Sequence, residues 1–225
     1  MAIAQISPVK PEIIYPESDG KPMADNTKQF RYIVMIEGGL DALYADHADV
    51  FVAGDFLWYP IEGHPEIRAA PDAMVVFGRP KGDRGSYLQW REEGIAPQVV
   101  FEVLSPGNTA MEMTRKFHFY DRYGVEEYYV YDPDNGELQG FRRVGADLEE
   151  IETMQGWVSP RLGIRFELQG DDLVLYHPDG TRFETFIQVT QRAQKAEARA
   201  DEAHARAERL AAQLRALGIE PDNAK

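Results

Sequence analysis

Hydrophobic positions in the first part of the chain recur either at helical spacing or in short unbroken runs. They follow helical spacing over residues 28–45, which predicts a first helix, and Gly38 and Gly39 within it each cost about 1 kcal/mol relative to alanine. A second helix is predicted over residues 112–123. The short runs predict strands at residues 50–59, 73–77, 98–104 and 127–131. This order is typical of a mixed α/β (α+β) domain.

From residue 138 the pattern changes to short β-like runs separated by turns. The runs lie at residues 138–143, 148–153, 163–170, 172–180 and 181–189. Asp134-Asn135-Gly136 and Pro178-Asp179-Gly180 are strong turn sequences and predict hairpins. We therefore expect a small antiparallel extension of a mixed central sheet that is flanked by helices.

The C-terminal segment carries a different period. Its apolar positions alternate between spacings of four and three residues: Val189, Ala193, Ala196, Ala200, Ala203, Ala207, Leu210, Leu214 and Leu217. This is a heptad seam with charged flanks, and Gly218 ends it. The pattern favours a coiled coil that joins two copies into a homodimer. A single solvated, alanine-rich helix is the alternative interpretation.

These patterns divide the chain into four parts. They are an N-terminal arm of residues 1–25, a domain of residues 26–187, a helix of residues 188–218 and a tail of residues 219–225. The arm holds four prolines and little periodicity, so we expect it to be extended and to pack over the domain. Ile13, Ile14 and Tyr15 are its candidate anchors.

Composition and charge restrict the class of protein. The chain has 225 residues, of which 44% are hydrophobic, enough for one domain with a core and an appendage. Its net charge is −14, and residues 188–225 carry seven basic and six acidic groups, so the preceding body carries −15. This argues against a protein that coats nucleic acid through a general basic field. A metal-dependent site remains compatible, because it requires acids.

The absence of cysteine rules out disulfides and thiolate metal sites and fits a reducing compartment. The first residues have no secretory-signal pattern, and no run of 18 apolar residues is present. We therefore expect a cytoplasmic protein without a membrane partner. The five histidines show no metal-ligand spacing, so oxygen ligands are favoured for any metal.

Two acidic residues interrupt the apolar runs of the predicted sheet. Asp72 begins one strand and Glu102 lies within the next one. Burying an unpaired charge is costly, so each carboxylate requires a reason. A shared Mg²⁺ (or Mn²⁺) ion is one such reason. The alternatives are a strand-entry turn residue after Pro71 and a structural carboxylate capped by its neighbours.

Lys116 falls on the side of the second predicted helix that carries Met113, Phe117 and Tyr120. A divalent ion lowers the pKa of bound water and neutralises charge on a phosphodiester. A lysine nearby would orient or help deprotonate the attacking water, or stabilise developing charge. A solvent-facing helix lysine is the alternative.

Four stretches resemble a known protein family. They are PDAMVVFGRPKGDRGSYLQW, QVVFEVLSPGN, EMTRKFHFYDRYGVEEYYVYDP and GWVSPRLGIRF. Through them, residues 12–187 closely resemble the Uma-two family of restriction endonucleases in the PD-(D/E)XK nuclease superfamily. The resemblance implies a restriction-endonuclease-like fold and a metal-dependent endonuclease acting on DNA. Asp72 and Glu102 would bind Mg²⁺, and Lys116 would assist attack by water.

The chain departs from the superfamily motif at one position. That motif places a lysine two residues after the strand glutamate, where this chain has Leu104, and the family pattern offers Lys116 instead. A catalytically inactive binding or scaffold protein on a nuclease fold is therefore the alternative function. A less favoured third interpretation is a toxin-like or mobile-element accessory whose tail binds a partner protein.

Further residues are weaker candidates for the same site. Glu37, Asp55, Gln98 and Tyr120 are candidates to support the metal ligands. The alternatives are a surface position for Glu37, a bulge residue beside Gly54 for Asp55, and core packing or exposure for the other two. The long loop after residue 77 combines cations with aromatic residues, which is typical of phosphate binding. Its cations are Arg79, Lys81, Arg84 and Arg91.

Overall fold

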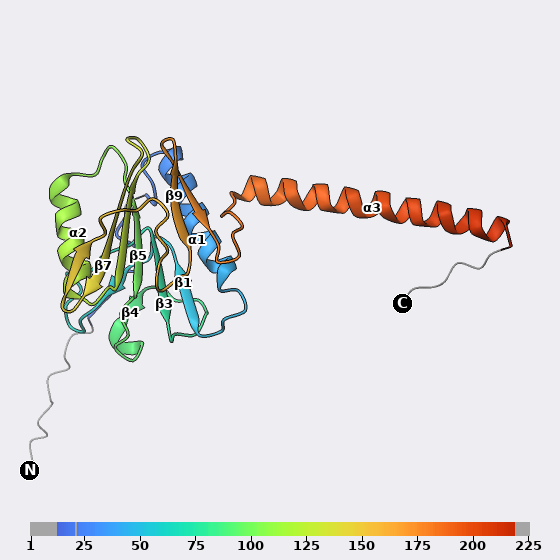
Figure 1. Cartoon of the computed structure of the whole chain (residues 1–225). Helices are drawn as coiled ribbons and strands as arrows, with labels where there is room; N and C mark the ends of the chain where they lie inside the picture. Colours follow the sequence, from blue (N-terminus) through green and yellow to red (C-terminus); the bar gives the residue numbers. More distant parts are fainter. Residues whose placement is uncertain (1–12, 21, 219–225) are drawn as a thin grey trace, which may run out of the picture. The chain divides into compact units, whose positions relative to one another are not determined.

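The structure is a computed structural model that describes residues 13–20 and 22–218, shown in sequence colours in Figure 1. Its contacts divide the chain between Phe183 and Glu184 into a body and a C-terminal unit. The sequence pattern instead ends the domain at residue 187.

A six-stranded mixed sheet forms the centre of the body, in the order β1-β3-β5-β6-β7-β8. Its strands are β1 (Val50–Ala53), β3 (Ala73–Phe77), β5 (Val99–Val103), β6 (Glu127–Asp132), β7 (Glu137–Val144) and β8 (Asp147–Glu150). Only β5 and β6 are parallel; the other neighbours in this sheet are antiparallel. The predicted mixed central sheet is confirmed.

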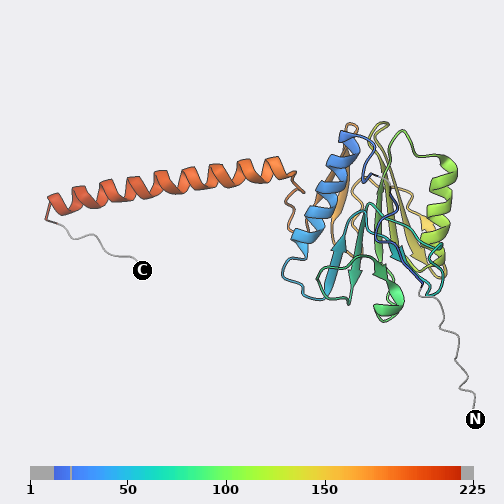
Figure 2. The ribbon, with the colours of Figure 1, turned by 180° about the vertical axis from the view of Figure 1, so that it is seen from behind.

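Two helices cover the two faces of this sheet, α1 (Thr27–Leu43) and α2 (Ala110–Arg122). Figures 1 and 2 show them on opposite sides of the strands. Asn26 caps α1, because its side chain accepts hydrogen bonds from the backbone N–H groups of Lys28 and Gln29. The crossover helix α2 connects β5 to β6, as a parallel pair of strands requires.

Strand alternation separates the buried residues into two cores. On β5, Val99, Phe101 and Val103 pack on the α1 side, whereas Val100 packs on the α2 side. Both faces of the central strands are covered, which explains their nearly continuous apolar runs. Glu102 therefore points toward α2. A carboxylate buried there requires hydrogen-bond donors to offset the cost of burying its charge.

Five short elements complete the described part of the body. β2 (Trp58–Tyr59) pairs in parallel with β4 (Tyr87–Leu88), which leads into the short 3-10 helix η1 (Gln89–Arg91). β9 (Arg165–Gln169) and β10 (Asp172–Tyr176) form an antiparallel hairpin. Their buried residues, such as Phe166 and Leu175, join the α1-side core.

The structure corrects three of our expectations. Residues 50–59 do not form one strand, because the chain turns at Asp55, whose φ of 46° lies in the left-handed region. Residues 181–189 are not a strand, since a helix begins at Phe186. Among the proposed anchors of the arm, only Tyr15 packs on the body, against Tyr59 and Trp90. Residues 1–12 of the arm lie outside the described residues.

The C-terminal unit contains the helix α3 (Phe186–Ala216). Thr185 and Gln188 form a reciprocal capping box at its start, in which each side chain binds the other residue's backbone N–H. No residue of this helix is buried. In the part of the chain that the structure describes, no helix is both long and apolar enough to cross a membrane.

Candidate active site

Asp72 and Glu102 lie across from each other on neighbouring strands. β3 and β5 are antiparallel with Ala73 opposite Phe101, so the next step of the ladder brings Asp72 opposite Glu102. Opposed side chains of this kind have Cβ atoms about 5 Å apart. The two side chains are 9% and 3% exposed, respectively. The fold thus brings two buried carboxylates together on the α2 side of the sheet.

Glu102 accepts hydrogen bonds from two side chains of α2. Lys116 Nζ lies 2.7 Å from Oε2, and Tyr120 Oη lies 2.5 Å from Oε1. The donors are four residues apart, so they share one face of the helix. The helix thus delivers a cation and a hydroxyl to one carboxylate, although Lys116 and Glu102 are 14 residues apart in the chain.

The charge of Lys116 follows from its surroundings. Burial acts to lower the pKa of its ammonium group, but the negative charges of Glu102 and Asp72 outweigh that effect and raise the pKa above its ordinary value. Lys116 therefore remains protonated at neutral pH. In this state it can donate hydrogen bonds and stabilise negative charge, but it cannot take a proton from water.

The carboxylate of Asp72 has fewer hydrogen-bond donors than that of Glu102. Its Oδ2 accepts a hydrogen bond from the backbone N–H of Val103 at 2.6 Å, and the described residues provide no ion-pair partner for it. Burial, followed by the charge of Glu102, raises the pKa of Asp72 well above its ordinary value. A cation placed between the two carboxylates would oppose both effects.

These groups lie in the wall of a cavity of about 800 Å³. Its acidic lining residues are Asp19, Asp25, Asp55, Asp72, Glu102 and Glu112, and its basic ones are Arg68, Arg115 and Lys116. Asp55 is held beside Asp72 by its backbone N–H, which donates to the Asp72 carbonyl at 3.3 Å. Burial, followed by the charge of Asp19, raises the pKa of Asp55. The cavity therefore concentrates negative charge with incomplete compensation.

Two of the predicted supporting residues lie elsewhere. Glu37 lines a separate cavity of about 400 Å³, and its pKa is raised by burial and then by Asp41. Gln98 stands at the opposite end of β5 from Glu102, where its side chain accepts the Phe77 N–H at 2.8 Å. The structure thus brings Asp55 and Tyr120 to the carboxylates, but not Glu37 or Gln98.

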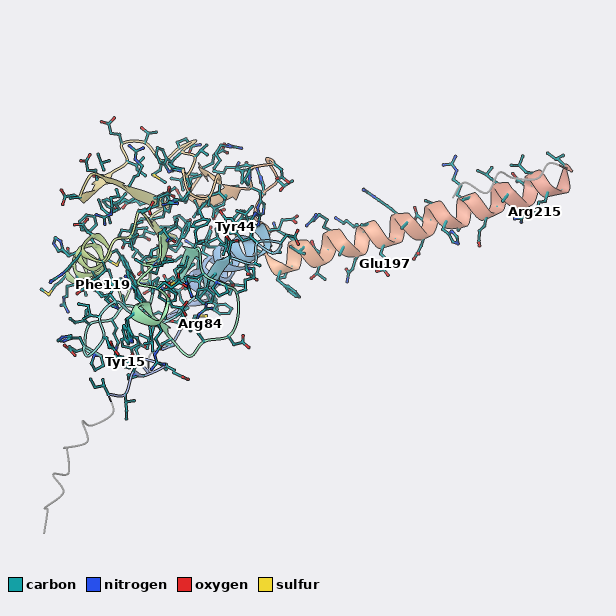
Figure 3. The ribbon with its side chains drawn as sticks, turned by 90° about the horizontal axis from the view of Figure 1, so that it is seen from below. Tyr15, Tyr44, Arg84, Phe119, Glu197 and Arg215 are labelled. Atoms are coloured by element: carbon teal, nitrogen blue, oxygen red, sulfur yellow. The ribbon has the colours of Figure 1, made fainter. Side chains whose placement is uncertain are left out.

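The predicted phosphate-binding loop is also remote from the carboxylates, since none of its four cations lines their cavity. Arg79 and Arg84 bind Glu92 at 2.9 and 2.7 Å, and Lys81 binds Asp41 at 2.9 Å. Figure 3 shows Arg84 well separated from Phe119, a residue of the carboxylate cavity. Three of the four cations are therefore occupied in folding the loop, and Arg91 is exposed.

Several residues of the site were not selected from the sequence. Gln29 on α1 donates to the Val103 carbonyl at 2.8 Å, and Asp25 accepts from Ser105 at 2.6 Å. Arg68 and Arg115 also line the cavity. The adjacent Arg115-Lys116 pair was the one available signal, since the other residues arrive from distant segments.

A third buried carboxylate, Glu127, lies on the α1 side of the sheet and has a structural role. It accepts hydrogen bonds from Tyr129 Oη at 2.9 Å, from Arg161 N at 2.8 Å and from Ser159 Oγ. Trp157 donates to Tyr129 Oη at 3.1 Å. The GWVSPRLGIRF stretch is thus fastened to β6 by one carboxylate.

The site offers oxygen ligands suited to a hydrated Mg²⁺ ion and not to zinc. Among the described residues, no group of three or more His, Asp or Glu side chains is placed to hold a metal. Mg²⁺ commonly binds only one or two carboxylates and keeps several waters. Glu102 retains acceptor capacity beside its two donors, because each carboxylate oxygen has two lone pairs. Asp72 and Glu102 therefore fit such an ion.

A comparison with protein-family models assigns this chain to a family. A family model named Uma2, with the description "Putative restriction endonuclease", matches residues 38–173. One similar solved structure is that of "a putative nuclease" from Anabaena variabilis, with 16% sequence identity and a TM-score of 0.45. The match covers 62% of this chain and 74% of that one. No curated protein sequence matches this chain.

Proposed function

We propose the function of this chain from its family: it belongs to the Uma-two family of restriction endonucleases. The proposed activity is hydrolysis of phosphodiester bonds in DNA, at the cavity that holds Asp72 and Glu102. The observation that carries this proposal is the 2.7 Å contact between Lys116 and Glu102, beside a second buried carboxylate. Lys116 thereby places a cation beside Glu102, which the apolar Leu104 cannot do.

In the proposed reaction, a water molecule loses a proton as its oxygen bonds to phosphorus, one phosphorus–oxygen ester bond breaks, and the leaving alkoxide takes up a proton from the solvent. Asp72 and Glu102 would hold a Mg²⁺ (or Mn²⁺) ion, which, when bound, supplies positive charge for the phosphate and acidifies water. Lys116 is protonated and donates to the phosphate oxygens as negative charge develops on them. Tyr120 fixes the orientation of Glu102 through its 2.5 Å hydrogen bond.

The alternative is a nuclease-fold protein that binds a partner without catalysis. Its supporting observation is that the Lys116 ammonium is already paired with Glu102. The two functions differ in what Lys116 must do, because a structural ion pair needs no substrate.

Cleavage of labelled DNA with Mg²⁺ or Mn²⁺ tests the proposal. We expect the wild-type protein to cleave and Lys116→Gln to be slower by about 10²–10³-fold, typical for loss of a donor to developing charge. Lys28→Gln is the control, since its ammonium bonds Pro133 and Asp134 outside the cavity. We expect it to retain the wild-type rate.

Asp72→Asn should abolish cleavage and weaken Mn²⁺ binding measured by calorimetry. Wild-type protein that cleaves neither DNA nor RNA with either ion would overturn the proposal. Equal Mn²⁺ affinity in Asp72→Asn and the wild type would overturn the assignment of Asp72 as a metal ligand.

A further inference from the structure

Two arginines, Arg68 and Arg115, line the cavity. Arg68 donates a hydrogen bond to the Pro65 carbonyl at 3.3 Å, and Arg115 is exposed on α2. In the described part of the chain neither forms an ion pair, whereas Arg79 and Arg84 are both paired with Glu92. Unpaired guanidinium groups beside an acidic site are suited to holding phosphate oxygens.

An aromatic ring lies in the same wall. Phe119 lines the cavity and is only partly buried, although its α2 neighbour Tyr120 is fully buried. The Phe119 ring packs against the rings of Trp58 and Tyr123, with centroid distances of 5.2 and 4.7 Å. A fixed ring with an accessible surface is a platform on which an unpaired base can stack.

The arm forms part of the wall of the cavity. The segment 22–25 lines it and is tied down, because Asp25 accepts a hydrogen bond from Ser105 and its N–H donates to Gln29 at 2.8 Å. Gln29 in turn donates to the Val103 carbonyl. The arm therefore forms a bonded wall, and a strand must enter beside it to reach the buried carboxylates.

The charge distribution opposes a second strand. Asp19, Asp25, Asp55 and Glu112 line the cavity together with the carboxylate pair, so the lining carries six acids and three bases. Duplex DNA carries one negative charge per about 1.7 Å of axis, twice the charge of either of its strands, so such a lining repels a duplex more strongly than a single strand. A volume of about 800 Å³ is in the range that encloses a small organic ligand, the size of one or two nucleotides.

We infer that the substrate of this site is an unpaired nucleic-acid strand, with its phosphates on Arg68 and Arg115 and a base stacked on Phe119. The inference rests on the proposed nuclease function and names its substrate class. It assigns the three residues to binding, while Asp72, Glu102 and Lys116 line the same cavity.

Fluorescence anisotropy of a labelled 12-nucleotide strand, alone and annealed to its complement, tests the inference in Ca²⁺ or EDTA buffer. We expect the single strand to bind at least tenfold more tightly than the duplex. Phe119→Ala should weaken single-strand binding about tenfold and Phe119→Tyr should restore it. Arg115→Ala should weaken binding and reduce the salt slope by about one. Arg31→Ala, an exposed arginine outside the cavity, is the matched control.

Equal or tighter duplex binding would overturn the inference, as would wild-type affinity in both Phe119→Ala and Arg115→Ala. Cleavage of duplex in preference to single strands would overturn it while leaving the nuclease function intact. A wild-type protein that neither cleaves nor binds nucleic acid would overturn both the nuclease function and the inferred substrate.

Discussion

At the scale of single residues, the site depends on how Glu102 and Asp72 are compensated. Glu102 has an ammonium and a hydroxyl as partners, whereas Asp72 has one backbone N–H. The two buried acids are therefore unequal, and replacing each partner should have a different effect on folding. Two predictions concern this difference.

Asp72→Asn should stabilise the folded protein, and the gain should depend on pH. The folded-state pKa of Asp72 is raised by burial and by Glu102, so the folded state binds a proton more readily than the unfolded chain. The stability contributed by that proton is present below the pKa of the unfolded chain and is lost as pH rises through the folded pKa. Asparagine does not titrate, so the variant does not lose this stability as pH rises. Urea denaturation at pH 4 and pH 8 should show a larger advantage at pH 8.

Asp147→Asn, a change at an exposed aspartate, is the control for this experiment and should show no such trend. An Asp72→Asn variant that is less stable than the wild type at pH 8 would contradict the prediction. It would mean that Asp72 is already compensated in the folded state.

Two buried tyrosines on the α2 side provide a matched pair. Tyr120→Phe removes a donor from the buried Glu102 and should cost about 1–3 kcal/mol. The Tyr128 hydroxyl is buried with no hydrogen-bond partner among the described residues, so Tyr128→Phe should be neutral or slightly stabilising. Urea denaturation measures both, and equal losses would contradict this assignment.

The sequence could identify Asp72 and Glu102, because carboxylates that interrupt apolar runs are conspicuous. It also suggested Lys116 and Tyr120, which share a helix face. It could not identify Arg68 or Gln29, since the approach of these residues to β5 depends on how distant segments pack. Gln98 was misleading for a different reason: it lies at the opposite end of β5 from Glu102, where its side chain binds the Phe77 N–H.

At the scale of elements, α1 shows that two neighbouring glycines have different roles. A Cβ at Gly39 would lie 2.2 Å from the Phe183 ring, whereas one at Gly38 would meet nothing within 4 Å. Gly39 thus allows Phe183 to pack on the helix, and Gly38 has no such role. The expectation of an equal helix penalty at both positions therefore overlooks packing.

Gly38→Ala should stabilise the protein by up to about 1 kcal/mol, because alanine favours the helix. Gly39→Ala should destabilise it by about 1–3 kcal/mol, because the buried Phe183 must shift. Thermal unfolding of the two variants beside the wild type measures this. A Gly39→Ala variant as stable as Gly38→Ala would contradict the proposed contact.

Most helices and central strands could be predicted from periodicity, since both sheet faces are buried. The break after β1 could not, because the left-handed conformation of Asp55 is set by its hydrogen bond to Asp72 across the sheet. Residues 181–189 were also mispredicted. There, the capping box formed by Thr185 and Gln188 favours a helix, although the β-branched residues favour a strand.

At the scale of the whole molecule, α3 leaves its heptad seam exposed, including Val189 and Leu210. Arg192, Arg199 and Arg206 recur every seven residues on one flank of the seam, and Glu197 lies on the other. An antiparallel pair would place arginine flank against arginine flank, whereas a parallel pair places unlike flanks together. Figure 3 shows Glu197 and Arg215 along this helix. We predict a parallel homodimer.

The absence of cysteine permits a direct test. Val189→Cys places one thiol on the seam, so a parallel dimer should oxidise to a covalent dimer in non-reducing gels. Gln191→Cys, which lies off the seam, should not. Covalent dimers that form only when Val189→Cys and Leu217→Cys proteins are mixed would show an antiparallel pair instead. A monomer by analytical ultracentrifugation would contradict self-association.

The placement of Lys116 on α2 has a consequence for which insertions the protein can tolerate. Surface loops ordinarily accept added or deleted residues with little effect. The connection between Val103 and Ala110 is different, because it sets the position of α2 along β5 and hence the reach of the ammonium. A lysine carried by the strand would be indifferent to the length of this loop. Here one extra residue in a surface loop would move the Lys116 ammonium relative to Glu102 without changing the order of strands in the sheet.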